Sequence, residues 1–157
     1  MQQQTIIRPA EAADAAAIAA LIGVAFAAQP VPLDPPPSAL GETAETIARQ
    51  LAFGGGAVAV GEGRLFGVVM WAEEAGTLHV ARLSVAPEAR RRGIARALLA
   101  AAEAAARVRG LGRLTLGTRL PLVGNRALFA ACGYVETARH AHPGYDAPTW
   151  VEMEKRL

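Results

Sequence analysis

Apolar positions recur along the chain with two different spacings, which separate the expected helices from the expected strands. Residues 10–28 are rich in alanine and place apolar side chains at helical spacing, whereas residues 5–8 form a short apolar run before Pro9. A second helical pattern begins at Ser38, and the glycines at 54–56 stop it. The first third of the chain therefore predicts one short strand followed by two helices.

The segment between these two helices, residues 29–37, contains five prolines. Proline fixes φ and lacks the backbone N–H donor that a regular element needs. We therefore expect a stiff loop here.

The middle of the chain has the pattern of a β-meander, in which strands are separated by tight turns. Three strands are expected at residues 57–60, 65–71 and 77–85, with tight turns at 61–63 and 73–76. By the two-residue period of a strand, His79, Ala81, Leu83 and Val85 share one face of the third strand.

The last third of the chain predicts a strand–helix–strand passage. The helix covers residues 94–109 and is followed by a strand at 113–118, an arrangement typical of a parallel crossover. A short helix at 125–132 then has Asn125 at its N-cap and Gly133 at its end. Two closing strands are expected at 134–139 and 149–155. The fold class is α+β, a mixed and mostly antiparallel sheet with flanking helices, in a single domain over residues 1–157.

Composition and charge exclude several classes of function. A net charge of +2 is too small to favour nucleic acid or an anionic membrane, and the local basic concentration is Arg90–Arg92. The fourteen apolar residues at 15–28 cannot span a bilayer. Cys132 is the only cysteine, so nothing argues for an oxidising compartment. We expect a cytoplasmic protein with no nucleic-acid or membrane partner.

The segment from Leu83 to Ala95 is the best candidate for a binding site. A strand runs into a glycine-containing turn, which opens directly into a helix. Unpaired N–H groups and the positive end of the helix dipole make such a turn an anion site, and Gly93 lets a phosphate approach the backbone. The segment is neither a P-loop nor a dinucleotide fingerprint. Taken alone, a solvated surface turn explains it equally well.

Two motifs place this turn in a known context. The sequence resembles the GCN5-related N-acetyltransferase (GNAT) superfamily, whose first motif is matched in order and spacing by Leu83, Val85, Pro87, Arg90, Gly93 and Ala95. A second motif, an Asn-led short helix that ends in Gly and an aromatic residue, is matched by Asn125, Ala127, Leu128, Phe129, Gly133 and Tyr134. The resemblance implies the GNAT acyltransferase fold, with a sheet of about six to seven strands.

The resemblance also implies a cosubstrate, acetyl-CoA, and a set of residues that bind it. The backbone of residues 83–85 would pair with the pantetheine arm, the turn would hold the pyrophosphate, and the short helix would line the other wall. The implied set is Leu83, Ser84, Val85, Arg90, Arg91, Arg92, Gly93, Ile94, Ala95, Arg96, Asn125 and Phe129.

Acetyl transfer by direct attack needs a base rather than a protein nucleophile, so Cys132 is expected to have a packing role. His79 is the leading base because imidazole exchanges protons near neutral pH, although a strand histidine satisfied by a neighbour is the alternative. Glu73 and Glu74, at the preceding turn, are weaker candidates. His140 and His142 lie close together but lack a third ligand, so no metal is expected.

One residue departs from the family pattern. Many members carry a tyrosine, interpreted as the general acid, where this sequence has Phe129. Tyr145, Tyr134 or water could supply the proton instead. The missing hydroxyl leaves two hypotheses: an N-acetyltransferase, or a non-catalytic acyl-CoA-binding sensor of the same fold.

The acceptor is expected to be an amine of a small molecule or peptide. Its pocket would be formed by the proline-rich loop, the strand face of His79 and residues 140–149, with Tyr145 and Trp150 as apolar walls. Asp34 and Asp146 could attract a cationic amine. Dimers are common in the family, and the apolar surplus allows a homodimer.

Overall fold

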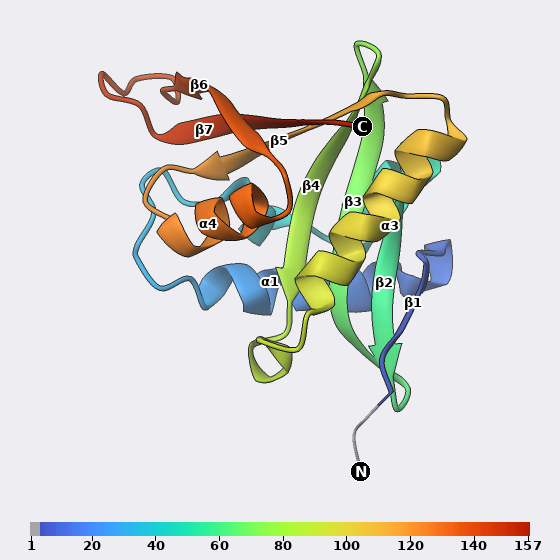
Figure 1. The fold of residues 1–157 in the computed structure, drawn as a ribbon. Helices are drawn as coiled ribbons and strands as arrows, with labels where there is room; N and C mark the ends of the chain where they lie inside the picture. The colour runs from blue at the N-terminus through green and yellow to red at the C-terminus, as the bar shows by residue number, and fades with distance from the viewer. Residues whose placement is uncertain (1–3) are drawn as a thin grey trace.

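A single seven-stranded sheet forms the centre of the protein (Figure 1), as seen in a computed structural model that describes residues 4–157. The strand order is β1-β2-β3-β4-β5-β7-β6, and only β4 and β5 pair in parallel. The strands are β1 (Ile6–Pro9), β2 (Gly55–Gly61), β3 (Arg64–Glu74), β4 (Thr77–Val85), β5 (Arg113–Arg119), β6 (Val135–His140) and β7 (Trp150–Arg156). The α+β class and the parallel crossover are confirmed.

Four α-helices flank the sheet, namely α1 (Ala15–Ala27), α2 (Ala44–Phe53), α3 (Ile94–Val108) and α4 (Val123–Ala131). Helices α1 and α2 pack together on one face of β2–β4, and α3 covers the opposite face (Figure 1). Helix α3 lies close to β3 because Gly67 has no side chain: a Cβ there would come 2.8 Å from Ile94 Cγ2. Within residues 4–157, no helix is long and apolar enough to cross a membrane.

The helical stretch expected from Ser38 is interrupted, which corrects the sequence prediction. A short 3₁₀ turn covers Ser38–Gly41, and α2 starts only after Thr43. Thr43 and Thr46 cap the helix reciprocally, since each hydroxyl accepts a hydrogen bond from the other residue's N–H, at 3.2 Å and 2.8 Å. This cap fixes the start of α2, and the extended backbone of Thr43 cannot continue a helix.

The expected N-cap of α4 is also wrong. The helix begins at Val123 after Leu122, so Asn125 lies inside the first turn. The asparagine side chain is therefore free to face the sheet rather than the helix end. Gly133, with φ of 95°, follows the helix as expected.

A β-bulge in β4 breaks the expected alternation of side chains. Met70 pairs with Ala81 but Val68 pairs with Ser84, so β4 has one extra residue at this point, and Arg82 there has φ of 57°. Residues that face each other across a ladder share a side of the sheet, so Ser84, and not Val85, lies on the side of His79 and Ala81. The prediction that His79 and Val85 share a face is wrong for this reason.

The bulge coincides with the place where β4 leaves β5. The parallel ladder joins Leu78, His79 and Val80 to residues 114–116 and has no further pairs. Beyond Val80 the two strands diverge, which leaves a gap in the middle of the sheet on the side of α4.

Candidate active site

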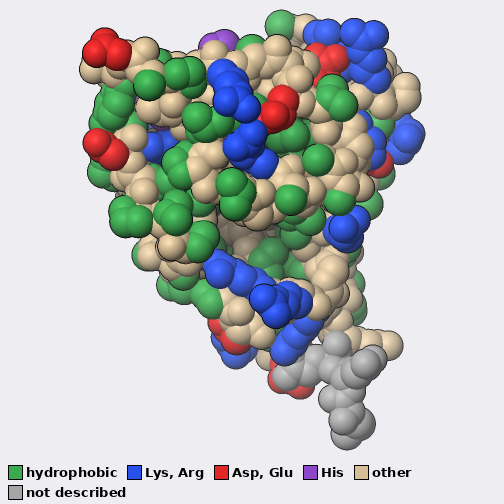
Figure 2. All heavy atoms as spheres, turned by 60° about the vertical axis from the view of Figure 1, so that its left-hand side comes forward, with side chains coloured by type: hydrophobic (Ala, Val, Ile, Leu, Met, Phe, Trp, Pro, Cys, Tyr) green, Lys and Arg blue, Asp and Glu red, His purple; other side chains and the backbone are tan. Residues whose placement is uncertain are grey.

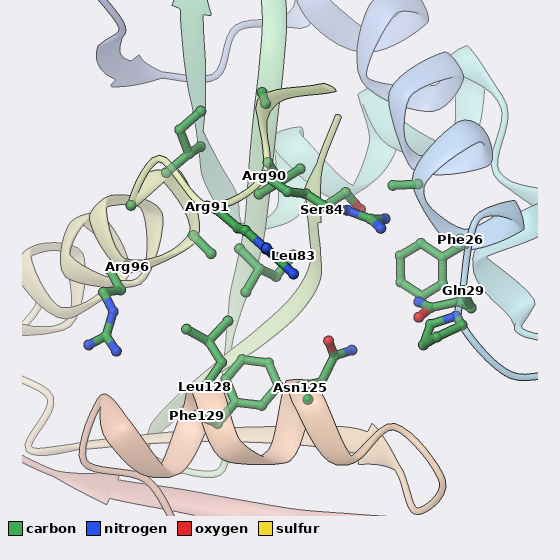
Figure 3. A pocket seen from close by; sticks show the side chains of 18 residues that line it. Phe26, Gln29, Leu83, Ser84, Arg90, Arg91, Arg96, Asn125, Leu128 and Phe129 are labelled. Atoms are coloured by element: carbon green, nitrogen blue, oxygen red, sulfur yellow. The ribbon is translucent and has the colours of Figure 1, made fainter. Parts of the chain in front are cut away.

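A cavity of about 520 Å³ lies beside the end of β4, beyond the point where this strand stops pairing with β5. Residues 83–85 form one wall, the turn into α3 forms the second, and α4 forms the third (Figure 3). The end of α1 closes the cavity, with Phe26 and Gln29 facing it. Figure 2 shows this face of the molecule hollowed, with Lys and Arg side chains along the lower rim.

The turn that leads into α3 presents backbone N–H groups at the cavity. Arg91 and Gly93 have φ of 65° and 76°, so the backbone curls twice in the left-handed region, as it does in anion-binding concavities. Ala97 N–H donates to the Gly93 carbonyl at 3.1 Å. The N–H groups of residues 94–96 therefore precede the helical ladder and point out of the helix start. Space around Gly93 is open, since a Cβ there would meet nothing within 4 Å.

The part of this turn that faces the cavity is positively charged. Arg90, Arg91 and Arg96 line the cavity, and no acidic residue does so in the described part of the chain. Glu88, on the same turn, pairs instead with Arg64 at 3.0 Å. The turn thus combines helix-start N–H groups with guanidinium groups, which suits a phosphorylated ligand.

Helix α4 contributes the side chains of Asn125, Leu128 and Phe129 to the wall opposite β4. Phe129 is 7% exposed and packs edge-on against Tyr134, with ring centroids 6.0 Å apart. Asn125 points into the cavity (Figure 3) and has no hydrogen-bond partner among residues 4–157. Asn125 and Phe129 also line a neighbouring cavity.

This second cavity, of about 450 Å³, shares the side chains of Phe26, Leu83, Asn125 and Phe129 with the first. Its other walls are the proline-rich loop, the His79 end of β4, the end of β5, and the loop before β7 with Trp150. Trp150 lies over β5 because Gly117 is bare: a Cβ there would come 3.1 Å from the indole ring. The two cavities are therefore adjacent, and these four shared side chains form the partition between them.

His79 lines the second cavity, and a chain of hydroxyl groups orients its imidazole. Thr77 Oγ1 donates to the Glu74 carbonyl at 2.8 Å, and Thr115 Oγ1 lies 3.5 Å from Thr77 Oγ1 and 3.1 Å from His79 Nδ1. The Thr77 proton is used, so in an unbroken chain of hydrogen bonds Thr115 donates to Thr77 and its oxygen accepts from Nδ1–H. His79 Nε2 is then left with its lone pair.

The structure gathers most of the predicted cofactor-binding residues around the first cavity. Leu83, Ser84, Val85, Arg90, Arg91, Gly93, Ile94, Ala95, Arg96, Asn125 and Phe129 line it, whereas Arg92 does not. Sequence reasoning missed the end of α1, where an aromatic residue in an alanine-rich helix gives no functional signal. It also missed the end of β5, where Arg119 lines the second cavity.

Three of the weaker catalytic candidates, Glu73, Glu74 and Tyr134, lie away from both cavities. Glu73 is exposed opposite Leu78 near the far end of the meander, and Glu74 follows it. Tyr134 is buried, and this burial strongly raises its pKa. Cys132 is partly buried behind α4. His140 stacks on Trp150 at 4.4 Å, and His142 Nδ1 is hydrogen-bonded to Thr149, so these two side chains have separate partners.

The Tyr145 side chain is hydrogen-bonded to the proline-rich loop and lines neither cavity. Its hydroxyl donates to Asp34 Oδ1 at 2.5 Å, and this hydrogen bond raises the pKa of Tyr145. A phenol with a raised pKa releases its proton less readily. Asp146 is exposed and lines neither cavity.

A sheet that opens beside a cationic helix start, with a second cavity behind it, is the architecture of an acyltransferase fold. The sequence profile of the Acetyltransferase (GNAT) family matches residues 27–134. The chain belongs to the GNAT acetyltransferase family. A search of curated proteins found no match.

Solved structures support the same fold over nearly the whole chain. The PaiA N-acetyltransferase of Thermoplasma acidophilum, solved with coenzyme A, has a TM-score of 0.80 at 16% identity, covering 98% of this chain and 99% of that one. A ribosomal-protein-alanine N-acetyltransferase of Brucella melitensis has a TM-score of 0.74 at 22% identity, covering 97% and 99%. A putative acetyltransferase of Salmonella typhimurium, solved with acetyl-CoA, has a TM-score of 0.73 at 22% identity, covering 98% and 94%.

Proposed function

We propose that this acetyltransferase moves an acetyl group from acetyl-CoA to a primary amine of a small molecule or peptide by direct attack. The observation that supports this most is the shared partition between the two cavities. A cationic cavity suited to a phosphorylated donor meets a second cavity that holds His79, and Leu83, Asn125 and Phe129 belong to both.

On the donor side, the turn holds the pyrophosphate with the N–H groups of residues 94–96 and the side chains of Arg90, Arg91 and Arg96. The pantetheine arm lies along residues 83–85, where β4 has no β5 partner and its backbone groups need one. The thioester then arrives at the partition, next to the second cavity.

On the acceptor side, His79 takes the proton of the attacking amine. Its Nε2 carries a lone pair as long as Thr115 accepts from Nδ1–H, so the hydroxyl chain keeps the base in its active tautomer. An amine that has lost its proton attacks the thioester carbonyl, and the coenzyme A thiolate leaves. No protein nucleophile is required.

The coenzyme A thiolate departs next to the Asn125 amide and the Phe129 ring, at the place where many family members have a tyrosine. Phe129 offers packing but no proton, and the amide of Asn125 is the polar group of α4 that lines both cavities. A thiolate is a fair leaving group near neutral pH, so donation of a hydrogen bond by Asn125 suffices for turnover.

Steady-state release of free coenzyme A with a panel of amines tests the transfer itself. We expect release above background hydrolysis with at least one class of amine. Tight acetyl-CoA binding without amine-dependent release would instead indicate a sensor. Calorimetry with coenzyme A and ADP in parallel checks the donor, because equal affinities would indicate a nucleotide site of another kind.

Substitution of Gly93→Glu tests the turn. A carboxylate at the open space beside the helix start repels a pyrophosphate, and we expect coenzyme A affinity to fall at least about 100-fold. Gly110→Glu is the matched control, since Gly110 ends the same helix with φ of 69° and equally open space. Both variants carry the same backbone strain, so equal affinities in the two would remove the turn from the donor site.

A further inference from the structure

The charge of the acceptor cavity points to the chemistry of its ligand. Among the described residues that line it, the charged or titratable side chains are His79, Arg82, Arg119 and His142, and none is acidic. A cavity built to attract a cation by charge would show the opposite lining. The cavity is therefore suited to an acceptor that carries a negative group besides its amine.

Of the two arginines, Arg82 already has its counter-ion. Its Nε donates to Glu42 Oε2 at 3.1 Å and its Nη2 to Ser38 Oγ at 3.2 Å. Glu42 is in turn held by Gln50 and Thr46. These hydrogen bonds occupy the guanidinium of Arg82 and stabilise the bulge of β4.

Arg119 has no counter-ion within residues 4–157. Its Nη2 donates to the Pro35 carbonyl at 2.6 Å, but its Nε is buried without a hydrogen-bond partner. The nearby carboxylate of Asp34 accepts from Tyr145 and forms no ion pair with Arg119. Burial lowers the pKa of this guanidinium, which agrees with a desolvated cation. A buried donor of this kind is costly unless a ligand satisfies it.

The position of Arg119 matches a ligand whose amine is at His79. Thr115, Gly117 and Arg119 alternate along one side of β5, and Thr115 is the residue that pairs with His79 in the parallel ladder. Arg119 lies four residues further along β5, and both Arg119 and His79 line the second cavity. Trp150 covers the bare Gly117 between them as an apolar floor.

We propose that Arg119 binds a carboxylate on the acceptor, so that the substrate class is a small amine bearing a carboxylate, such as an amino acid. This inference rests on the proposed acetyl transfer and names its acceptor. In the bound state the carboxylate accepts from the guanidinium of Arg119, while the amine faces His79 Nε2. Phe26, Phe129 and Trp150 surround the rest of the molecule.

Matched sets of amines test the proposal without any substitution. Each set contains an amino acid, its carboxamide and the corresponding decarboxylated amine, assayed by coenzyme A release. A charge-assisted hydrogen bond predicts that kcat/KM for the carboxylate exceeds that for the carboxamide about 10- to 100-fold, mainly through KM. Dipeptides extended at the C-terminus distinguish a free amino acid from a peptide, since a peptide acceptor would keep full activity with the extension.

Substitutions test whether Arg119 causes the preference for the carboxylate. Arg119→Gln should abolish the preference for the carboxylate while coenzyme A affinity stays unchanged, and Arg119→Lys should keep part of it. Arg113→Gln is the matched control at the other end of β5, outside both cavities. Equal rates with acids and carboxamides in the unmodified protein would overturn the carboxylate site and leave acetyl transfer intact. Absence of release with every amine would overturn the transfer itself.

Discussion

At the scale of single residues, the proposed role of His79 as a general base depends on Thr115, which lies far from it in sequence. The tautomer of a histidine is set by its hydrogen-bond partners, and His79 Nδ1 contacts Thr115, which leads through Thr77 to the Glu74 carbonyl. The hydroxyls thus act as positioning groups, and the imidazole acts on the substrate.

Replacement of His79 by alanine tests this arrangement. We expect kcat to fall by about 10²–10⁴-fold, because general-base help is lost. The loss is greatest at low pH, where more of the amine is protonated. Thr115→Val keeps the imidazole but removes its orientation, so kcat should fall less and coenzyme A affinity should not change. A pH–rate profile of His79→Ala that matches that of the unmodified protein would exclude His79 as the base.

At the scale of elements, the bulge of β4 creates the site. The extra residue at Arg82 shifts the register between β4 and β3 and coincides with the divergence of β4 from β5. Glu42, whose side chain is 8% exposed, anchors the bulge from the start of α2 through Arg82. A left-handed arginine costs energy, so this ion pair and the hydrogen bonds around it help to hold the conformation.

Substitution of Glu42→Gln should therefore weaken both the stability of the fold and the binding of the donor. Loss of the counter-ion of Arg82 is expected to lower the free energy of unfolding by about 1–3 kcal/mol, measured by urea denaturation. It should also raise KM for acetyl-CoA, because residues 83–85 follow the bulge. Glu45→Gln, on the exposed first turn of the same helix, is the control and should change stability by less than about 0.5 kcal/mol. An unchanged KM in Glu42→Gln would separate the bulge from the donor site.

At the scale of the whole molecule, two carboxylates link the helices to the sheet and make stability depend on pH. The hydrogen bond from Arg8 holds the pKa of Asp14 below its usual range. Burial alone would raise the pKa of Glu42, but hydrogen bonds from Gln50, Thr46 and Arg82 outweigh it and lower that pKa. Each carboxyl is therefore more acidic in the folded chain than in the unfolded chain.

The sign of the pH dependence follows from these directions. A lowered folded-state pKa contributes stability above about pH 4 that is lost as pH falls through the folded-state value. Thermal unfolding should show a Tm that falls steeply below about pH 4. An Asp14→Asn, Glu42→Gln double variant should be less stable at pH 7 but lose less Tm between pH 5 and 3. Parallel Tm curves for the two proteins would refute the assignment.

Much of the fold could be predicted from the sequence, because the signals involved act over a few residues. Apolar period, proline content and glycine turns indicated the strands and helices, and the segment 83–95 with the Asn125 helix indicated the turn that we propose binds the donor. The predicted helix start at Ser38 and the predicted N-cap at Asn125 failed because they depend on the hydrogen bonds at Thr43 and on the exact start of α4.

The sequence by itself thus determined the class of fold, the family and the cationic turn that suits the donor. The tertiary structure alone decided the register between β3 and β4, which moves Val85 off the side of His79. It also brought Arg119, Phe26 and Trp150 to one cavity from three distant segments. The physical reason is that strand register and cavity lining depend on pairings between residues far apart in the chain, and no local pattern records which partner a strand will meet.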